Sequence, residues 1–133
     1  MTPRAPHLYY RGSNPGDARR IATGDREWDS YLFTTATPEG ACWYGRHVEE
    51  IALRPDAAVL REGSREFRRF AGSARRESML AWASRIARAA RRAGFAAVEF
   101  VRQTDIGTPI LYQGAIVSRR EIGVCAGPGR RLR

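Results

Sequence analysis

The sequence predicts an α+β fold with a mostly antiparallel, split β-sheet, one long helix and two or three short helices. Short β-favouring runs alternate with turn-forming residues along the chain, and residues 73–93 show the apolar spacing of a single long helix. A strand, a polar turn and a second strand follow that helix. The 133 residues are enough for one domain and too few for two separate cores. We therefore expect a single domain over residues 1–133, with flexible ends at 1–6 and 123–133.

The composition indicates a basic, folded protein. The apolar fraction is 43% and the net charge is +9, with arginine as the basic residue and no lysine. Arginine offers planar, bidentate donors to phosphates and carboxylates, so a basic surface suits a nucleic acid, a phosphorylated ligand or an acidic protein. The charge alone does not choose among these partners.

The sequence contains no apolar run long enough for a membrane span and no apolar stretch typical of a secretory signal. Cys42 and Cys125 are its two cysteines, which is too few for a disulfide framework. We therefore expect a cytoplasmic protein with reduced thiols, present as a monomer or weak dimer without membrane partners.

The first third of the chain predicts one strand and mostly irregular structure after it. Residues 7–10 favour a strand that ends in the turn-forming segment 11–16. Residues 17–21 are compatible with one helical turn, and the polar residues 23–30 predict a loop.

Residues 31–45 predict the central strand–helix unit. An apolar strand over 31–35 leads into Thr37 as N-cap and Pro38 at the first helical position. Gly45 is expected to end the helix in a left-handed conformation, and either Trp43 or Tyr44 is expected to face the core. Such a junction can bind a flat ligand through hydroxyls, helix N–H groups and one aromatic ring, although buried aromatics of this kind more often belong to the core.

The next elements are two strands and two helices. Strands are predicted over 47–53 and 57–60. Residues 64–70 predict a short helix that starts at Ser64 and ends near Gly72. The long helix over 73–93 is expected to end at Gly94. Its apolar residues share one face, as expected for a buried helix surface: Met79, Leu80, Ala83, Ile86, Ala87 and Ala90.

The last third predicts a hairpin. A strand over 95–101, a polar turn over 102–109 and a strand over 110–117 give the expected order, and residues 118–122 extend the second strand.

Several polar residues in these turns could carry chemistry. Gly12 allows close approach to the backbone, and Arg11 and Ser13 add charge and hydroxyl donors, although the same residues also suit an ordinary solvated turn. Asp105, in the turn before Gly107, could stabilise positive charge in a cleft or simply form an Asx turn.

Glu99 is the alternative acid, on the preceding strand.

His7 and His47 have no metal-ligand spacing with each other or with the cysteines, so no metal site is predicted.

The order of these segments resembles that of the ADP-ribosyltransferases. Residues 10–13, Tyr-Arg-Gly-Ser, resemble the first motif of that superfamily. Phe33-Thr34-Thr35, followed by Ala41 and by Tyr44-Gly45, resembles its second motif. Residues 94–100 and then 105–108 are similar to the segment with its third, acidic motif. The likeness extends from residue 8 to 122 and is greatest to the small phage-encoded enzymes that act as anti-CRISPR proteins.

The resemblance implies an enzyme that uses NAD as a co-substrate. It implies that the Gly12 backbone holds the nicotinamide amide, that Arg11 holds the ribose or pyrophosphate, and that Tyr44 stacks on nicotinamide. Ser13 is a further implied NAD-binding residue. The pocket would be lined by three further residues: Phe33, Thr34 and Thr35. Arg11 stands where many relatives have histidine, and Asp105 where glutamate is usual, so both Asp105 and Glu99 are candidates for the catalytic acid.

The implied function is mono-ADP-ribosyl transfer to a macromolecular target, a protein or a nucleic-acid-associated complex, with a possible anti-CRISPR or host-defence role. Two alternatives remain. One is a non-catalytic basic module that binds nucleic acid or an acidic protein through the arginines of residues 73–93. The other is an antibiotic-modifying ADP-ribosyltransferase.

Overall fold

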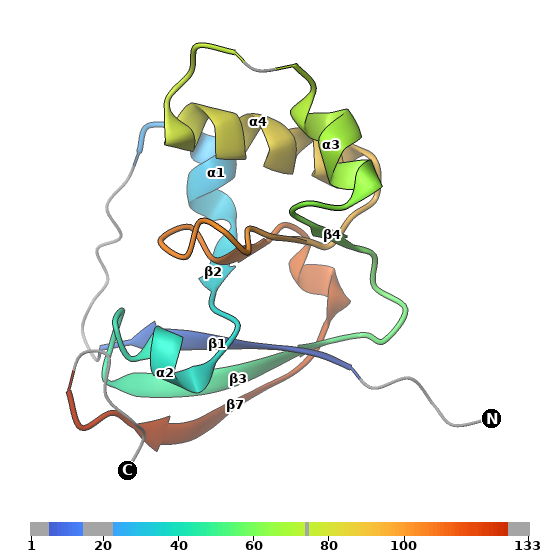
Figure 1. Cartoon of the computed structure of the whole chain (residues 1–133). Coiled ribbons are helices and arrows are strands. Elements are labelled where there is room, and N and C mark those ends of the chain that lie inside the picture. The colour runs from blue at the N-terminus through green and yellow to red at the C-terminus, as the bar shows by residue number, and fades with distance from the viewer. Residues whose placement is uncertain (1–5, 15–22, 74, 128–133) are drawn as a thin grey trace. The chain divides into compact units, whose positions relative to one another are not determined.

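A computed structural model describes residues 6–14, 23–73 and 75–127. This part of the chain contains seven strands in two sheets and four α-helices, which confirms the predicted α+β class. The chain divides into two compact units (Figure 1). The first consists of Met1–Ile21, Phe33–Ala57 and Gly114–Arg133, and the second of Ala22–Leu32 and Ala58–Gln113. None of the described helices combines the length and apolar character needed to cross a membrane.

The first unit contains an antiparallel sheet of three strands in the order β1-β3-β7. The strands are β1 (His7–Ser13), β3 (His47–Leu53) and β7 (Ile116–Val124). The predicted strand over 47–53 is confirmed. The prediction that the first strand ends at residue 10 is wrong, because Arg11, Gly12 and Ser13 pair with β3 in register. Pairing with a neighbouring strand overrides the turn preference of these residues.

Helix α2 (Pro38–Ala41) begins as predicted, because the Thr37 hydroxyl accepts a hydrogen bond from the Gly40 N–H and Pro38 occupies the first turn. Its end differs from the prediction. The helix stops at Ala41, and Gly45 is not among the described glycines with positive φ. Glycine is required at position 45 for another reason: a Cβ there would lie 2.3 Å from the Ser13 backbone nitrogen.

A disulfide joins Cys42, at the end of α2, to Cys125, directly after β7. The bond spans 83 positions of the sequence. Both cysteines are buried with Ala41 and Val48, and Tyr10 packs against this cluster. The expectation of reduced thiols is therefore wrong for this structure. The predicted flexible end at 123–133 is also wrong for its first residues, because β7 continues to Val124 and Cys125 is buried.

The second unit contains the strands β4 (Val59–Arg61), β5 (Ala97–Glu99) and β6 (Thr108–Ile110). The sheet order is β2-β6-β5-β4, where β2 (Leu32–Thr34) starts at the last residue of this unit's first segment. Strands β4 and β5 are parallel, and β5 and β6 are antiparallel. The predicted pairing of residues 95–101 with a following strand is thus confirmed at shorter length.

The predicted continuous strand over 110–117 is wrong. Strand β6 ends at Ile110, a short 3-10 helix η1 (Gln113–Ala115) follows, and β7 then pairs with β3 in the other sheet. The small residues Gly114 and Ala115 form the break between the two strands.

The helices of the second unit are α1 (Arg26–Ser30), α3 (Arg65–Ala71) and α4 (Met79–Arg92). Helix α3 has the predicted limits, with Ser64 as N-cap and Gly72, at a φ of 64°, as C-cap. Helix α4 begins later than predicted, because the Ser78 hydroxyl accepts from the Ala81 N–H and starts the helix there. Gly94 follows its end with a φ of 95°, as predicted.

The buried face of α4 consists of Ala83, Ser84, Ile86, Ala87 and Ala90. Met79 and Leu80 were expected on this face but are exposed.

Helix α1 lies where a loop was predicted. Asp25 accepts a hydrogen bond from the Trp28 N–H and acts as the N-cap, and Trp28 is buried. Five residues are too few to show helical periodicity in the sequence, so the helix depends on this cap and on burial of the indole. The predicted helical turn over 17–21 lies outside the described residues, as do residues 1–5 of the predicted flexible segment 1–6.

Candidate functional site

Two of the three segments that resemble ADP-ribosyltransferase motifs come together in the first unit. Tyr10 on β1 and Thr35 after β2 form an antiparallel bridge. The Tyr10 N–H donates to the Thr35 carbonyl at 2.9 Å, and the Thr35 N–H donates to the Tyr10 carbonyl at 2.7 Å. The strand that carries Arg11 is thereby fixed to the strand end that carries the threonines.

The β1 and α2 segments also approach each other closely at Gly12 and Gly45. A Cβ on Gly12 would lie 2.0 Å from the Ala41 carbonyl oxygen and 2.9 Å from the Gly45 nitrogen. Gly12 was expected to leave room for a ligand beside the backbone. The structure corrects this expectation, because the Ala41 carbonyl of α2 occupies that space.

Arg11 directs its side chain toward the end of β2. Its Nη1 donates to the Phe33 carbonyl at 3.4 Å, and its Nε lies 4.0 Å from Glu49 Oε1. The side chain is 26% exposed, so the guanidinium is held in place while it can still reach an anionic ligand.

The threonines differ in their surroundings. Thr34 is buried, Thr35 is partly exposed, and Phe33 is partly buried. The Thr35 hydroxyl donates to the Thr37 carbonyl at 2.8 Å, so it helps to shape the entry into α2.

Trp43 and Tyr44 follow α2 and are 69% and 53% exposed, respectively. The prediction that one of them faces the core is wrong, because the helix ends before either residue. Both rings are at the surface and can stack on a flat group.

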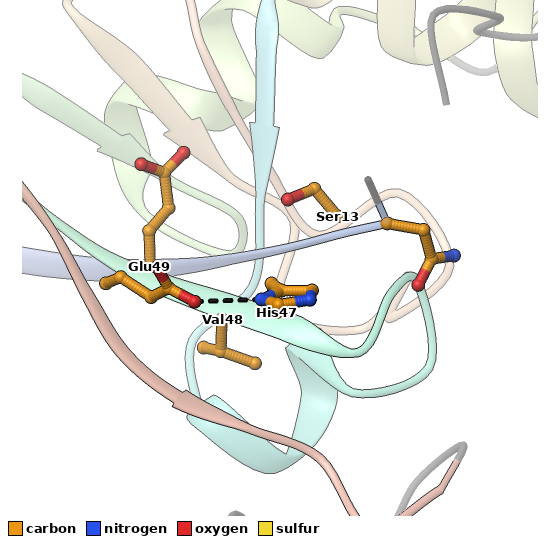
Figure 2. A pocket seen from close by; sticks show the side chains of 6 residues that line it. Ser13, His47, Val48 and Glu49 are labelled. Carbon is orange, nitrogen blue, oxygen red and sulfur yellow. Dashed lines mark hydrogen bonds and ion pairs between the residues drawn. The ribbon is translucent and has the colours of Figure 1, made fainter. Parts of the chain in front are cut away.

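The first unit also has a polar cavity of about 300 Å³ at one end of its sheet (Figure 2). Its lining residues are Ser13, Asn14, His47, Val48, Glu49 and Glu121. His47 Nδ1 lies 2.8 Å from Glu121 Oε1. Neither His47 nor Glu121 was predicted from the sequence as a site residue. The antiparallel pairing of β3 with β7, in which Glu49 lies opposite Glu121, places Glu121 near His47, and only knowledge of this register could have indicated it.

The two candidate acids belong to the second unit. Glu99 on β5 forms an ion pair with Arg61 of β4, with 3.2 Å between Oε2 and Nη1. Asp105 is exposed in the turn before β6, where the Gln103 carbonyl accepts from the Ile106 and Gly107 N–H groups. Gly107 has the positive φ, 68°, that this turn needs. The predicted cofactor-binding residues thus lie in one unit and the predicted acids in the other, and their convergence on one cleft stays a prediction.

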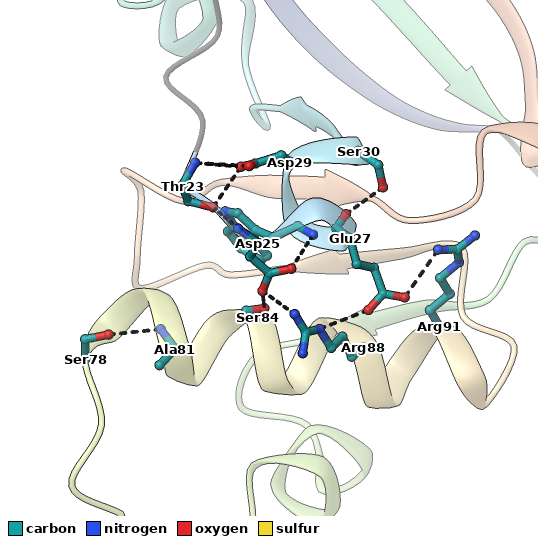
Figure 3. Close-up of polar contacts among 11 residues, drawn as sticks. Thr23, Asp25, Glu27, Asp29, Ser30, Ser78, Ala81, Ser84, Arg88 and Arg91 are labelled. Atoms are coloured by element: carbon teal, nitrogen blue, oxygen red, sulfur yellow. Dashed lines mark hydrogen bonds and ion pairs between the residues drawn. The ribbon is translucent and has the colours of Figure 1, made fainter.

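A network of charged side chains connects α1 and α4 within the second unit (Figure 3). Asp25 accepts a hydrogen bond of 2.6 Å from the Ser84 hydroxyl and forms an ion pair with Arg88. The hydrogen bonds from Arg88 and Ser84 hold the pKa of Asp25 well below its usual range. Arg88 and Arg91 also pair with Glu27, at 3.0 and 3.3 Å.

A hollow of about 630 Å³ lies beside this network and is lined partly by Asp25, Ser84, Arg85 and Arg88. Arg85 is occupied as well, since its Nη2 lies 2.6 Å from Glu77 Oε1 and its Nη1 donates to the Phe70 carbonyl. Arg85, Arg88 and Arg91 of α4 are therefore engaged within the unit, although the non-catalytic alternative uses the arginines of residues 73–93 for binding. Arg92, also on the lining, is exposed.

Within the described ranges, no group of three or more histidine, cysteine, aspartate or glutamate side chains is arranged to hold a metal ion. Comparisons of the chain with protein-family models, curated proteins and solved structures gave no match.

Proposed function

We propose that this protein is a mono-ADP-ribosyltransferase that cleaves NAD and transfers ADP-ribose to a macromolecular acceptor. One observation carries the proposal: in the first unit, the Arg11 segment, the threonine-bearing strand end and the helix before Tyr44 contact one another directly. These are the segments that the resemblance assigns to NAD. Residues 10–13 are well separated in sequence from residues 33–45, so the contact between them supports a common role.

The side chains in this arrangement suit the chemistry. An arginine binds phosphate or ribose oxygens, and an exposed tyrosine ring stacks on nicotinamide. Cleavage of the nicotinamide–ribose bond produces an oxocarbenium-like centre, which a carboxylate stabilises.

Asp105 is the favoured acid. The Glu99 side chain, which forms an ion pair with Arg61, is only 21% exposed, so a ligand reaches its carboxylate less easily. Asp105 lies in an exposed turn that a ligand can reach.

The first test compares Asp105→Asn with Glu99→Gln by nicotinamide release from NAD. We expect Asp105→Asn to lower the rate by about 100-fold or more, because an acid that stabilises charge in the transition state contributes at least that factor. Glu99→Gln should stay within about threefold of the wild type, a difference of under 1 kcal/mol. A larger loss of rate in Glu99→Gln than in Asp105→Asn would assign the role of catalytic acid to Glu99. An absence of nicotinamide release from the wild-type protein would contradict the proposed function.

The second test concerns the two exposed aromatic residues after α2. Tyr44→Ala should raise the KM for NAD by about 5- to 10-fold, since an aromatic stacking contact is worth about 1 kcal/mol. Trp43→Ala is the matched control, because Trp43 is also exposed and adjacent in sequence but has no assigned ligand. A larger rise in KM for Trp43→Ala than for Tyr44→Ala would instead assign the stacking role to Trp43.

For the acceptor, we propose a bacterial protein or a nucleic-acid-associated complex, in keeping with the likeness to phage-encoded anti-CRISPR enzymes. Incubation with labelled NAD and a bacterial extract should label a distinct macromolecular band. Labelling of an antibiotic instead of the extract would favour the antibiotic-modifying alternative.

The non-catalytic alternative is less well supported, because Arg85, Arg88 and Arg91 of α4 are engaged by Glu77, Asp25 and Glu27. It predicts salt-sensitive binding of nucleic acid without NAD turnover.

A further inference from the structure

We propose that His47 is the general base that removes the proton from the acceptor, and that Glu121 positions its ring. This inference rests on the proposed function and adds a catalytic residue to it. The acceptor group that it implies is a hydroxyl, either of a macromolecule or of water.

The geometry of the His47–Glu121 pair suits this role. His47 is the first residue of β3, and Glu121 lies on the neighbouring β7. A carboxylate 2.8 Å from Nδ1 holds the N–H on that nitrogen, so the lone pair of the neutral ring is on Nε2. The His47 side chain is 38% exposed and lines the cavity, which gives a small acceptor group access to it.

The position of the cavity connects it to the proposed NAD site. Ser13 pairs with His47, and Arg11, two residues earlier on the same face of β1, pairs with Glu49. Side chains of opposite residues in antiparallel strands have Cβ atoms about 5 Å apart. The base and the proposed phosphate- or ribose-binding arginine are therefore neighbours on one sheet face.

Two other polar side chains of the cavity, those of Glu49 and Asn14, are already engaged. Glu49 pairs with Arg119 and lies near Arg11. The Asn14 side-chain oxygen accepts a hydrogen bond of 2.8 Å from the Arg46 N–H. His47 is the one imidazole among the lining residues, and imidazole is the side chain best suited to accept a proton near neutral pH.

The acceptor oxygen forms a bond to C1′ of the nicotinamide ribose, and the C1′–nitrogen bond breaks with its electron pair going to nicotinamide. The hydroxyl proton passes to His47 Nε2 and then to solvent. Azide, an anionic nucleophile without a proton to lose, should react without the base.

The test measures nicotinamide release from NAD with water as acceptor and again with added sodium azide. In water, we expect His47→Gln to lower the rate by about 100-fold, the lower limit for loss of a general base. With azide, the variant should come within about threefold of the wild type, a difference of under 1 kcal/mol. Glu121→Gln should lower kcat by about tenfold with an unchanged KM for NAD, because it acts only through the ring.

His7→Gln is the matched control, because His7 is the other histidine of the chain and lies at the far end of β1, opposite Leu53. It should show wild-type rates with both acceptors. If His47→Gln lowers the rate of nicotinamide release equally with water and with azide, or lowers it with neither, the role of His47 is overturned. Turnover by the wild type would still support the proposed function in that case. No turnover by the wild type in either condition would overturn both. If His47→Gln unfolds at a temperature well below that of the wild type, the Glu121→Gln variant replaces it as the test. An unchanged kcat of Glu121→Gln would then overturn the proposal.

Discussion

The two units of the chain are stabilised in different ways. In the first, backbone contacts and one covalent bond hold α2 to the sheet: Gly12 and Gly45 let β1 meet the α2 segment, and the Cys42–Cys125 bond ties that segment to the end of β7. In the second, side chains hold the helices in place. Phe67, Trp82 and Phe100 form edge-on and tilted ring contacts, and the Asp25–Arg88 network holds α1 to α4.

This difference suggests a division of roles. The candidate NAD-binding residues lie in the unit whose geometry is set by the backbone, which tolerates little displacement. Arg85, Arg88 and Arg91 of α4, whose sequence suggested a binding surface, form ion pairs within the second unit. The comparison can be tested by changes that should affect one unit and spare the other.

The largest expected effect is that of removing the disulfide. Cys42→Ala combined with Cys125→Ala should lower the free energy of unfolding by about 4 kcal/mol, because the bond closes a long loop in the unfolded chain. Urea unfolding measures the total loss in free energy of unfolding, and amide hydrogen exchange shows which elements are affected. Loss of the bond also removes the tie between α2 and the end of β7 in the folded first unit, so local opening should accelerate exchange in β1, β3 and β7 more than in α4. Acceleration of the same size in α4, as expected from global unfolding alone, would contradict the proposed difference between the units.

Gly12→Ala should have the next largest effect. Its Cβ would meet backbone atoms at 2.0 and 2.9 Å, so the strand must move away from α2, at a cost of about 3 kcal/mol. The control is Gly24→Ala in the second unit, where no heavy atom lies within 4 Å of the added carbon. Its positive φ of 89° gives an expected cost of only about 1–2 kcal/mol. Thermal unfolding of the two variants should separate them clearly.

Asp25→Ala should destabilise the second unit by about 2 kcal/mol, through loss of a helix cap and of charged hydrogen bonds. Asp56→Ala, at an exposed pair with Arg54, should change stability by less than about 1 kcal/mol. Chemical unfolding monitored through Trp28 and Trp82 fluorescence can compare them.

The Asp25 contribution should also depend on pH. Because the folded-state pKa is lowered, the unfolded chain takes up the proton first as the pH falls. The stabilisation is therefore complete above the ordinary aspartate pKa of about 4 and decreases progressively below it. Asp25→Asn should be less stable than the wild type at pH 7, and the gap should narrow in acid. A constant gap down to about pH 2 would contradict this role.

Local chemistry explains which parts of the fold the sequence could predict. Thr37 with Pro38, Ser64 with Gly72, and Gly94 mark helix ends through contacts within a few residues, and the structure confirms them. Helix α1 and the extension of β1 through Gly12 depend on burial and on strand pairing, which the local sequence does not report.

The candidate site follows the same pattern. The resemblance assigned Arg11 and Phe33 to one site, whereas the His47–Glu121 pair required the register of β3 and β7. The Cys42–Cys125 bond was not predicted, because a separation of 83 residues leaves no local signal.

The Cys42–Cys125 bond also has a topological consequence. It closes a covalent ring that contains all of β4, β5, β6, α3 and α4. A protease that cuts once after Arg75 or Arg76, which are exposed, would open this ring without releasing a fragment. The nicked protein would run as one species on a non-reducing gel and as two on a reducing gel. Material made in a reducing host would separate under both conditions, so this simple assay reports which form of the protein a preparation contains.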